Sequence, residues 1–334
     1  MAASVAALRQ IAFELERTGA PTYRVRAFRR AAEVVAGLPD GELAQRVEQG
    51  TLRQLNGIGA TTAEVIDQAA RGQQPTYLAD LLAAAVPSEQ GSLRAALKGD
   101  CHTHSDWSDG GSPPEEMAEA ARDLGLSWIA LTDHSPRLTV ARGLTAERLE
   151  TQLRVIARLN ERLAPFRILT GIECDILEDG SLDQTDDLLG RLDVVVASVH
   201  SKLRMDEGPM TKRMITAVSN PLVDVLGHAT GRILAGGRTR PESEFDAQAV
   251  FTACQEHNTA VEINCRPERQ DPPDPLLYLA AELGCLFSID TDAHAPGQLD
   301  WIGSGCRRAE EAGLGPERII NSLEADDLLA LTRP

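Results

Sequence analysis

An alternation of short apolar runs with longer amphipathic stretches constrains the fold most strongly, and it begins near residue 98. The short β-branched or apolar runs predict seven strands, over 98–103, 127–132, 168–173, 192–199, 223–227, 259–264 and 286–290. The stretches between them predict helices over 113–125, 145–163, 209–219, 243–256 and 274–284. Strand–helix alternation requires parallel strands. We therefore expect an α/β fold, either an open sheet or a barrel of the TIM type that is one unit short.

Histidines gather at the C-terminal ends of these predicted strands. The chain has seven, and six lie at strand ends: His102, His104, His134, His200, His228 and His294. Only His257 lies elsewhere, in a turn. A single histidine is more often a structural or surface residue, but ligands in βα barrels converge at this edge. Six such placements favour a shared site.

Three carboxylates join the histidines at the same edge: Asp109, Glu173 and Asp292. His102 and His104 are two residues apart, so strand geometry places both imidazoles on one side. Cys101 and Thr103 then face the other way, which makes Cys101 a core residue. Nine nitrogen and oxygen ligands without a thiolate suit Zn, Mn or Fe ions. They exceed the needs of one tetrahedral ion. We expect two or three divalent ions, with Glu173 as a bridge.

The N-terminal region has a different, all-helical pattern. Apolar spacing predicts helices over 4–18, 22–37, 40–49 and 61–71. Four arginines gather in the second helix, at Arg24, Arg26, Arg29 and Arg30. They form either a solvated helix face or a DNA-binding face. Gly57 and Gly59 predict a tight hairpin before the last helix, whose first backbone N–H groups are suited to a DNA phosphate.

Charge separates the two regions and bears on their partners. The net charge is −17, but residues 1–98 hold 11 basic against 10 acidic side chains, and residues 99–334 hold 22 against 40. A uniformly acidic surface would repel nucleic acid, whereas this distribution does not exclude it. We expect a helical domain over 1–85, a linker over 86–98 and an α/β domain over 99–334. We also predict a cytoplasmic monomer with reduced cysteines and neither signal peptide nor membrane helix.

The ligand-bearing segments resemble the PHP (polymerase and histidinol phosphatase) domain. The similarity rests on HTHSDWSD, TDH, GIE, SVH, GH and DAH in the order that this family shows, within about 99–300. Further segments, such as GIECDILEDGSLD and EINCRPERQD, are similar to the PHP domains of bacterial family X DNA polymerases. Residues 1–85 resemble the helix-hairpin-helix domain of the same polymerases through PTYRVRAFRRAA and LNGIGATTAEVI. The resemblance implies a distorted seven-stranded (βα)7 TIM-like barrel with a small all-α domain before it.

The resemblance also implies an allotment of ligands. One ion takes His102, His104, Glu173 and Asp292, where metal-activated water is expected to perform catalysis. A second takes Glu173, His200 and His228, and a third takes Asp109, His134 and His294. Arg269, Arg232 and Lys202 follow the motifs and are candidates to bind the substrate phosphate, or to form surface ion pairs. Asp175 and Asp290 are expected either to orient imidazoles or to sit at the edge of the core.

Three functions are compatible with these features. The first is a DNA-processing phosphoesterase acting as a 3′–5′ exonuclease, a 3′-phosphatase or an abasic-site nuclease. The second is a small-molecule phosphatase, such as one for histidinol phosphate, and the third is an inactive scaffold, which the intact ligand set argues against. Residues 1–97 contain no lysine, so Schiff-base lyase chemistry is not expected. The short linker leaves no room for a polymerase palm, so we expect no polymerase activity.

Overall fold

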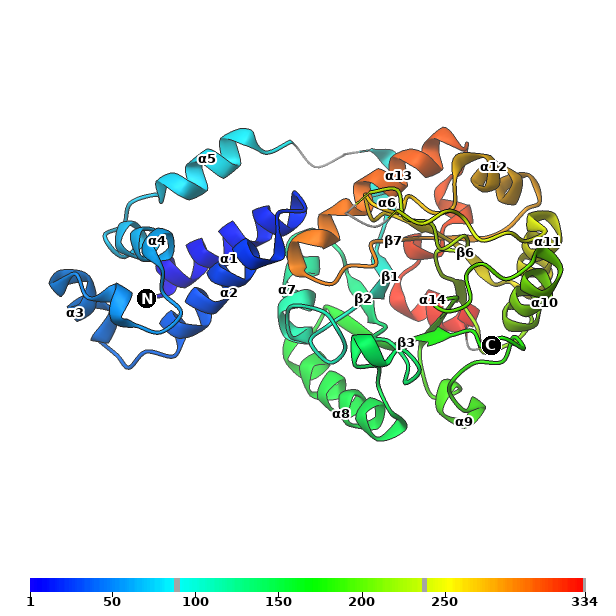
Figure 1. Ribbon diagram of the computed structural model, residues 1–334, viewed down its shortest axis with the longest axis horizontal. Helices are drawn as coiled ribbons and strands as arrows, with labels where there is room; N and C mark the ends of the chain where they lie inside the picture. The colour runs from blue at the N-terminus through cyan, green and yellow to red at the C-terminus, as the bar shows by residue number, and fades with distance from the viewer. Residues whose placement is uncertain (87–90, 236–238, 333–334) are drawn as a thin grey trace. The chain divides into compact units, whose positions relative to one another are not determined.

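The computed structural model describes residues 1–86, 91–235 and 239–332, and the chain divides into two units, Met1–Pro87 and Ser88–Pro334 (Figure 1). Each unit has a hydrophobic core of its own. Within the described ranges, no helix has both the length and the apolar character needed to cross a membrane. All six cysteines are buried and free.

The first unit is a helical bundle. Its helices are α1 (Ala2–Arg17), α2 (Thr22–Ala36), α3 (Glu42–Gln49), α4 (Ala60–Ala70) and α5 (Thr76–Ala84), with a short 3₁₀ turn at Leu52–Gln54. In α1, Leu8, Ile11 and Leu15 lie at helical spacing and are fully buried or nearly so, because they form one stripe against the other helices. The four predicted helices are present, and α5 is an addition that the sequence analysis did not include.

The second unit contains a seven-stranded parallel sheet. The strands are β1 (Gly99–Thr103), β2 (Trp128–Leu131), β3 (Arg167–Asp175), β4 (Val194–Ser198), β5 (Val225–Leu226), β6 (Ala260–Asn264) and β7 (Phe287–Asp290). They pair in sequence order from β1 to β7, all in parallel. The predicted strands and the barrel-like α/β architecture are therefore confirmed.

Helices surround this sheet. They are α6 (Ser92–Ala96), α7 (Pro114–Asp123), α8 (Ala146–Leu163), α9 (Asp186–Leu189), α10 (Glu207–Val218), α11 (Ala247–His257), α12 (Asp274–Glu282), α13 (Ile302–Glu311) and α14 (Ala325–Thr332) (Figure 1). The five helices predicted between strands are present. The sequence analysis missed α6, α9, α13 and α14.

The strands are buried on both faces, as expected for a parallel sheet covered by helices. One cluster, which includes Cys101, Leu169 and Val196, lies on the inner side of the strands, and a larger cluster lies between strands and helices. Cys101 is fully buried in the inner cluster, which confirms its predicted core position. In β3, Glu173 lies an even number of positions after Leu169, so the two side chains point to the same face of the sheet. Glu173 therefore extends the inner side toward the C-terminal edge of the sheet.

The seam between the first and last strands is closed by a residue from the C-terminal segment. Asn321 donates through its Nδ2 to the carbonyl oxygens of Gly99 and Ile289, at 3.2 and 2.9 Å. Its Oδ1 accepts from the Ile289 N–H at 2.7 Å, and its own carbonyl accepts from the Lys98 N–H at 2.7 Å. Beyond this point, Thr103 and Ala293 form a parallel bridge. One side chain thus substitutes for strand pairing at the seam.

Candidate metal centre

The nine predicted ligands come together at the C-terminal edge of the sheet. They lie on strands or in the loops that directly follow β1, β2, β3, β4, β5 and β7, at His102, His104, Asp109, His134, Glu173, His200, His228, Asp292 and His294. Neighbouring imidazoles stand close to one another, with ring centroids 4.1 Å apart for His104 and His294 and 4.4 Å apart for His104 and His134. The parallel sheet places all of these strand ends at one edge, which explains the convergence.

Glu173 occupies the middle of this cluster. Its Oε1 lies 2.9 Å from His228 Nε2, 3.1 Å from His200 Nε2 and 3.5 Å from His102 Nε2. Its Oε2 lies 2.6 Å from His134 Nδ1. Each carboxylate oxygen therefore faces a different part of the cluster, which is the geometry that a bridging ligand needs.

The other two carboxylates are at the periphery of the cluster. Asp292 Oδ1 lies 3.4 Å from His104 Nε2 and 3.6 Å from His294 Nδ1. Asp109 Oδ1 lies 3.3 Å from His294 Nε2 and 3.4 Å from His134 Nε2. The side chain of Asp109 is 38% exposed, against 3% for Asp292. The cluster thus has a buried inner part around Glu173 and Asp292 and a more open outer part at Asp109.

Many of these buried polar atoms have no hydrogen-bond partner among the described residues. They are His102 Nε2, both ring nitrogens of His104, and Nδ1 of His200 and His228. Burial of an unpartnered polar atom is costly, and imidazole nitrogen with carboxylate oxygen is a donor set that divalent transition metals favour. The residues present therefore fit several divalent ions.

The geometry groups the ligands in three overlapping sets. The atoms within each set lie within 4.8 Å of one another, and the sets are His102, His104 and Glu173; His134, Glu173 and His200; and His104, Asp109, His134 and His294. The first and third sets resemble two of the predicted ion positions. The second set contains His134 where the resemblance implied His228, although His228 also contacts Glu173.

The charges in the cluster also favour cations. Burial raises the pKa of Glu173, but nearby His200, His102 and His134 together hold it well below its usual value. Burial lowers the pKa of His134, but the carboxylates of Glu173 and Asp109 raise it to about 10. A proton on His134 therefore helps to neutralise the buried carboxylates when no metal does so, whereas burial lowers the pKa of His104 and that of His228, the latter to about 4. Metal ions would take over the neutralising role.

Glu262 is a functional residue that the sequence analysis missed. It is fully buried in β6, and its Oε1 lies 2.6 Å from His102 Nδ1. Its Oε2 accepts from the backbone N–H of His228 and from Nδ2 of Asn264, the latter at 3.1 Å. A carboxylate on Nδ1 directs Nε2 of His102 toward the cluster. The sequence holds one indication of this role. In β6, Glu262 alternates with apolar residues that face outward, so its own side chain faces inward.

The two predicted supporting aspartates differ. Asp175 Oδ1 accepts from the His200 N–H at 3.2 Å and lies 3.5 Å from His200 Nδ1, so it is placed to orient that imidazole. Asp290 contacts no imidazole among the described residues, so of its two expected roles the structure supports the one at the edge of the core. It accepts instead from the Cys101 N–H at 2.8 Å and from Asn321 Nδ2 at 2.9 Å, because it lies deeper between β1 and β7.

The predicted phosphate-binding residues lie in loops at this edge. Arg269 has Nε 3.5 Å from Asp292 Oδ2, and its Nη1 is buried without a partner among the described residues. Arg232 is engaged by the carbonyl oxygens of Arg269 and Gln270, so it supports the loop after β6. Lys202 is exposed after β4. Its ammonium group is therefore accessible to solvent at the edge that holds the cluster.

Arg266 is a second residue that the sequence analysis missed. Its Nη1 lies 3.3 Å from His294 Nδ1 and 3.6 Å from Asp292 Oδ1. Glu268 holds the other side of the guanidinium, at 2.7 Å. Arg266 thus places a positive charge directly beside two of the predicted ligands.

The hairpin in the first unit presents its backbone to solvent. Gly57 has φ +96°, and a Cβ there would lie 3.0 Å from the Arg30 side chain, so both conformation and space favour glycine. Gly59 precedes α4, and its N–H donates to Thr62 Oγ1 at 2.9 Å. Ile58 is buried between the two exposed glycines. The hairpin is therefore anchored by one apolar side chain while its backbone stays accessible.

The four arginines of α2 have different surroundings. Arg26 is exposed, Arg24 donates to the Tyr77 hydroxyl, and Arg30 is exposed beside Glu33 at 3.0 Å. Arg29 forms a two-pronged ion pair with Glu16 of α1, both contacts at 2.8 Å. Arg29 therefore holds two helices together and is the least available of the four for DNA.

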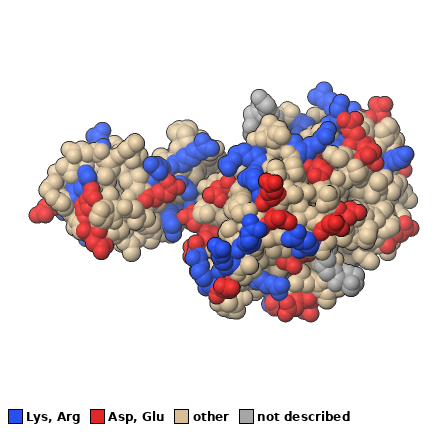
Figure 2. Space-filling view, turned by 90° about the horizontal axis from the view of Figure 1, so that it is seen from below, with Lys and Arg blue, Asp and Glu red and all other residues tan. Residues whose placement is uncertain are grey.

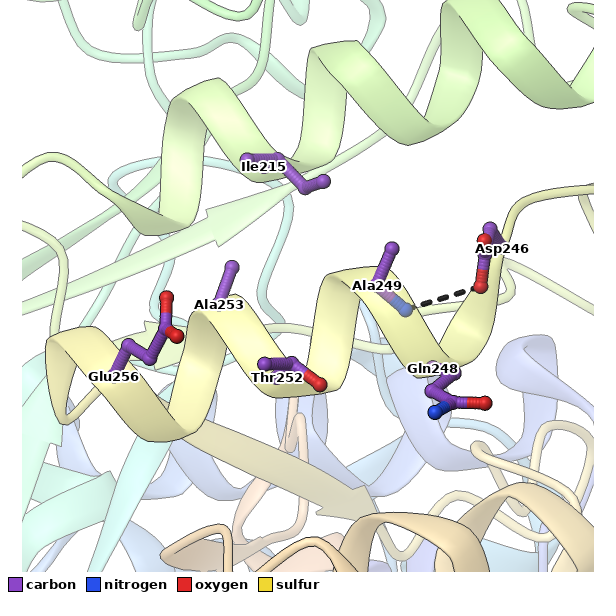
Figure 3. A pocket seen from close by; sticks show the side chains of 7 residues that line it. All are labelled: Ile215, Asp246, Gln248, Ala249, Thr252, Ala253 and Glu256. Atoms are coloured by element: carbon purple, nitrogen blue, oxygen red, sulfur yellow. Dashed lines mark hydrogen bonds between the residues drawn. The ribbon is translucent and has the colours of Figure 1, made fainter.

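A groove of about 430 Å³ lies elsewhere in the second unit, between α10 and α11 (Figure 3). It is lined by Ile215, Asp246, Gln248, Ala249, Thr252, Ala253 and Glu256. Asp246 is already used as the N-terminal cap of α11, where it accepts from the Ala249 N–H at 3.0 Å. The lining holds none of the predicted ligands. The cluster at the sheet edge is therefore the stronger candidate site.

Two domain families match the chain. A model of the PHP domain matches residues 100–266, and a model of a helix-hairpin-helix domain matches residues 2–74. The PHP match includes seven of the nine predicted ligands, and the second match includes the glycine hairpin.

Similar curated proteins fall into two kinds. The chain is 41% identical over 237 residues to the DNA polymerase/3′-5′ exonuclease PolX of Bacillus subtilis, covering 71% of this chain but 41% of that relative. It thus spans less than half the length of PolX. It is 29% identical over 234 residues to a protein of Thermoanaerobacter sp. named as a probable phosphatase, covering 67% of this chain and 89% of the relative.

One solved structure has a similar fold. It is histidinol phosphate phosphatase from Lactococcus lactis, complexed with zinc, L-histidinol and phosphate. The TM-score is 0.51 at 20% identity, and the match covers 65% of this chain and 94% of that one. At this identity the match supports the fold of the second unit.

Proposed function

The chain belongs to the PHP domain family, and on that premise we propose that it is a metal-dependent phosphoesterase that acts on DNA ends or damaged sites. A PHP-type phosphoesterase agrees with the family and with the probable phosphatases among its relatives. The choice of DNA over a small molecule is the proposal. Its proposed activities are those of a 3′–5′ exonuclease, a 3′-phosphatase or an abasic-site nuclease.

The observation that carries the chemistry is the cluster of buried imidazoles around the Glu173 carboxylate, in which several ring nitrogens have no hydrogen-bond partner among the described residues. Divalent ions held there supply Lewis-acid stabilisation of a phosphoryl oxygen and lower the pKa of water. The protein's own groups complete the site. Glu262 orients His102, Asp175 orients His200, and Arg269 offers an unpartnered N–H to an incoming phosphate. We propose two or three Zn, Mn or Fe ions.

The first unit supports DNA as the substrate. It matches a helix-hairpin-helix domain, and its glycine hairpin leaves backbone N–H groups exposed at the start of α4. The relative PolX carries both exonuclease and polymerase in its name. We propose that this chain shares the hydrolytic activity without polymerisation, because few residues lie between its two domain matches. A monomer in the cytoplasm, where thiols stay reduced, would suit this activity.

The acidity of the second unit is compatible with this substrate. Figure 2 shows Lys and Arg side chains interspersed with Asp and Glu on the larger unit, so the acid surplus is not a uniform coat. Bound cations would also reverse the local charge that a phosphate meets at the cluster. Net charge therefore does not argue against DNA.

A small-molecule phosphatase is the second candidate. The similarity to a protein named as a probable phosphatase extends over 89% of that protein's length and 67% of this chain. That function explains the second unit alone. It gives residues 1–85 no role.

A substrate panel separates the two functions. The full chain, loaded with Mn²⁺ or Zn²⁺, is incubated with 3′-phosphate DNA, a 3′-hydroxyl single strand, an abasic duplex and histidinol phosphate. We expect turnover of at least one DNA substrate, and turnover of histidinol phosphate alone would overturn the DNA proposal. His104→Ala and Asp292→Ala are expected to lose both activity and bound metal. His257→Ala, on the exposed histidine outside the cluster, is the matched control and should retain both.

A further inference from the structure

The loop after β2 starts at a predicted ligand of the metal centre, and its far end is hydrogen-bonded back to the same residue. It begins after His134, and at its other end the N–H of Leu144 donates to the His134 carbonyl at 2.7 Å. At the returning end, a Cβ on Gly143 would lie 1.8 Å from the Ser135 carbonyl oxygen, so only glycine fits there. A surface loop whose ends meet in this way is an Ω-loop, and such loops are frequently functional. We call residues 135–143 the β2 loop.

Contacts from neighbouring elements hold the β2 loop in one conformation. The backbone N–H of Arg137 donates to Asp183 Oδ2 at 2.8 Å, which ties the loop to the segment after β3. Arg148 of α8 donates to the carbonyl oxygen of Arg142. Ala141 is buried at 2% exposure in a short 3₁₀ turn. The backbone is therefore fixed at both flanks of the tip.

The tip of this ordered loop exposes an apolar side chain between two cations. Val140 is 91% exposed, which is the largest exposure of any large hydrophobic residue that the structure describes. Arg137 and Arg142 are exposed on either side of it, and neither guanidinium has an ion pair among the described residues. Since the loop is held in place, this exposure is a property of the fold.

Several surface arginines of the same unit are neutralised, whereas Arg154 and Arg158 of α8 have no ion pair among the described residues. Arg162 pairs with Glu115, Arg167 pairs with Asp326 at 2.8 Å, and Arg191 pairs with Glu150 at 3.1 Å. These pairs lie on or beside helices, at positions outside the β2 loop. Arg137 and Arg142 are therefore distinguished by their position, because they flank the exposed Val140 in a loop that is joined to the predicted ligand His134.

We infer that the β2 loop binds a single-stranded nucleic acid and guides it to the metal centre. Two guanidinium groups suit two backbone phosphates, and an exposed apolar side chain between them suits the face of a base or a sugar. A small phosphate ester that fills the metal centre has no group to reach this tip. This role rests on the proposed DNA activity. It places the nucleic-acid strand beside the β2 loop where it enters the metal centre.

The test compares two substrates on the metal-loaded full chain. They are a short fluorescent single-stranded oligodeoxynucleotide and p-nitrophenyl phosphate, each assayed across a range of salt concentrations with Mn²⁺. The variants are the double change Arg137→Gln/Arg142→Gln and the single change Val140→Ser. The control is Arg154→Gln/Arg158→Gln, which removes the same charge from exposed positions of α8. Thermal unfolding of each variant checks that it folds.

The double variant is expected to lower the ratio of kcat/KM for the oligonucleotide to that for p-nitrophenyl phosphate by about tenfold or more, as loss of two charge-assisted contacts implies. The slope of log kcat/KM against log salt should fall by about 1.4, because each phosphate contact to a single strand contributes about 0.7. Val140→Ser should lower the ratio several-fold without changing the slope, since an apolar contact releases no counterions.

Two negative results are distinguishable. If wild-type protein hydrolyses the oligonucleotide and the double variant matches the α8 control in both ratio and slope, the role of the β2 loop is refuted while the DNA activity stands. If wild-type protein hydrolyses p-nitrophenyl phosphate but no DNA substrate, the proposed function fails and the inference fails with it.

Discussion

Replacement of Glu262 by glutamine tests how the metal centre is supported. The two side chains have nearly the same volume, so the change removes the charge and one acceptor without leaving a cavity. Glu262 Oε1 lies 2.6 Å from His102 Nδ1, and Oε2 accepts from the backbone N–H of His228 and from Asn264. All of these partners can donate. A glutamine offers one oxygen and one NH₂ group, so in either orientation it sets a donor against a donor.

The expected loss follows from this geometry. Removal of the carboxylate that holds a metal-ligating histidine typically lowers metal affinity about 10- to 100-fold, which is about 1.4–2.7 kcal/mol. The measurement is a competition titration of Zn²⁺ between the protein and a chromogenic chelator. Glu282→Gln, an exposed change of the same charge on α12, is the control. If E262Q and wild-type protein bind Zn²⁺ with equal affinity, Glu262 does not support His102 as we describe.

Three further predictions concern stability and the first unit. Gly143→Ala should lower the free energy of unfolding, measured in urea, by about 1–3 kcal/mol, because the alanine Cβ would overlap the Ser135 carbonyl. The control is Gly208→Ala, which has open space around it and should not destabilise the protein. Removal of metal with EDTA should lower Tm, because Glu173 and its neighbours lose their counterions, and Zn²⁺ at ~100 times its Kd should restore about 2.7 kcal/mol per site; an unchanged Tm would argue against metal at the cluster. Deletion of residues 1–85 should weaken DNA binding in a fluorescence anisotropy assay and spare hydrolysis of p-nitrophenyl phosphate, and equal DNA affinity would remove the first unit from the proposal.

The sequence predicted the strands well because each has a strong local signal. Short apolar runs such as VVVAS in β4 are bounded by turn residues and are buried on both faces. The ligands could be predicted from the strands. In a parallel sheet all C-terminal strand ends lie at one edge, so histidines at these ends come together there. Local pattern and global fold agree at these positions.

The residues that were missed depend on contacts between distant segments. Glu262 lies in a strand interior, where an acid is rare, and its partner His102 is 160 residues away. For Asp290 the sequence left two roles open, and its contacts with the distant Cys101 and Asn321 decide for the core. Neither Asn321 nor the helices near it carry a motif. Their role comes from the seam that they close, and a local pattern cannot show it.

The seam at Asn321 has a consequence for the order of events during synthesis. The first strand leaves the ribosome early, but its open edge is capped only when Asn321 emerges, more than two hundred residues later. Until then the emerging chain exposes unpaired strand edges, which are prone to aggregate. The cluster draws ligands from both β1 and the segment after β7. Nascent protein should therefore acquire its full complement of metal only after the segment that follows β7 has been synthesised.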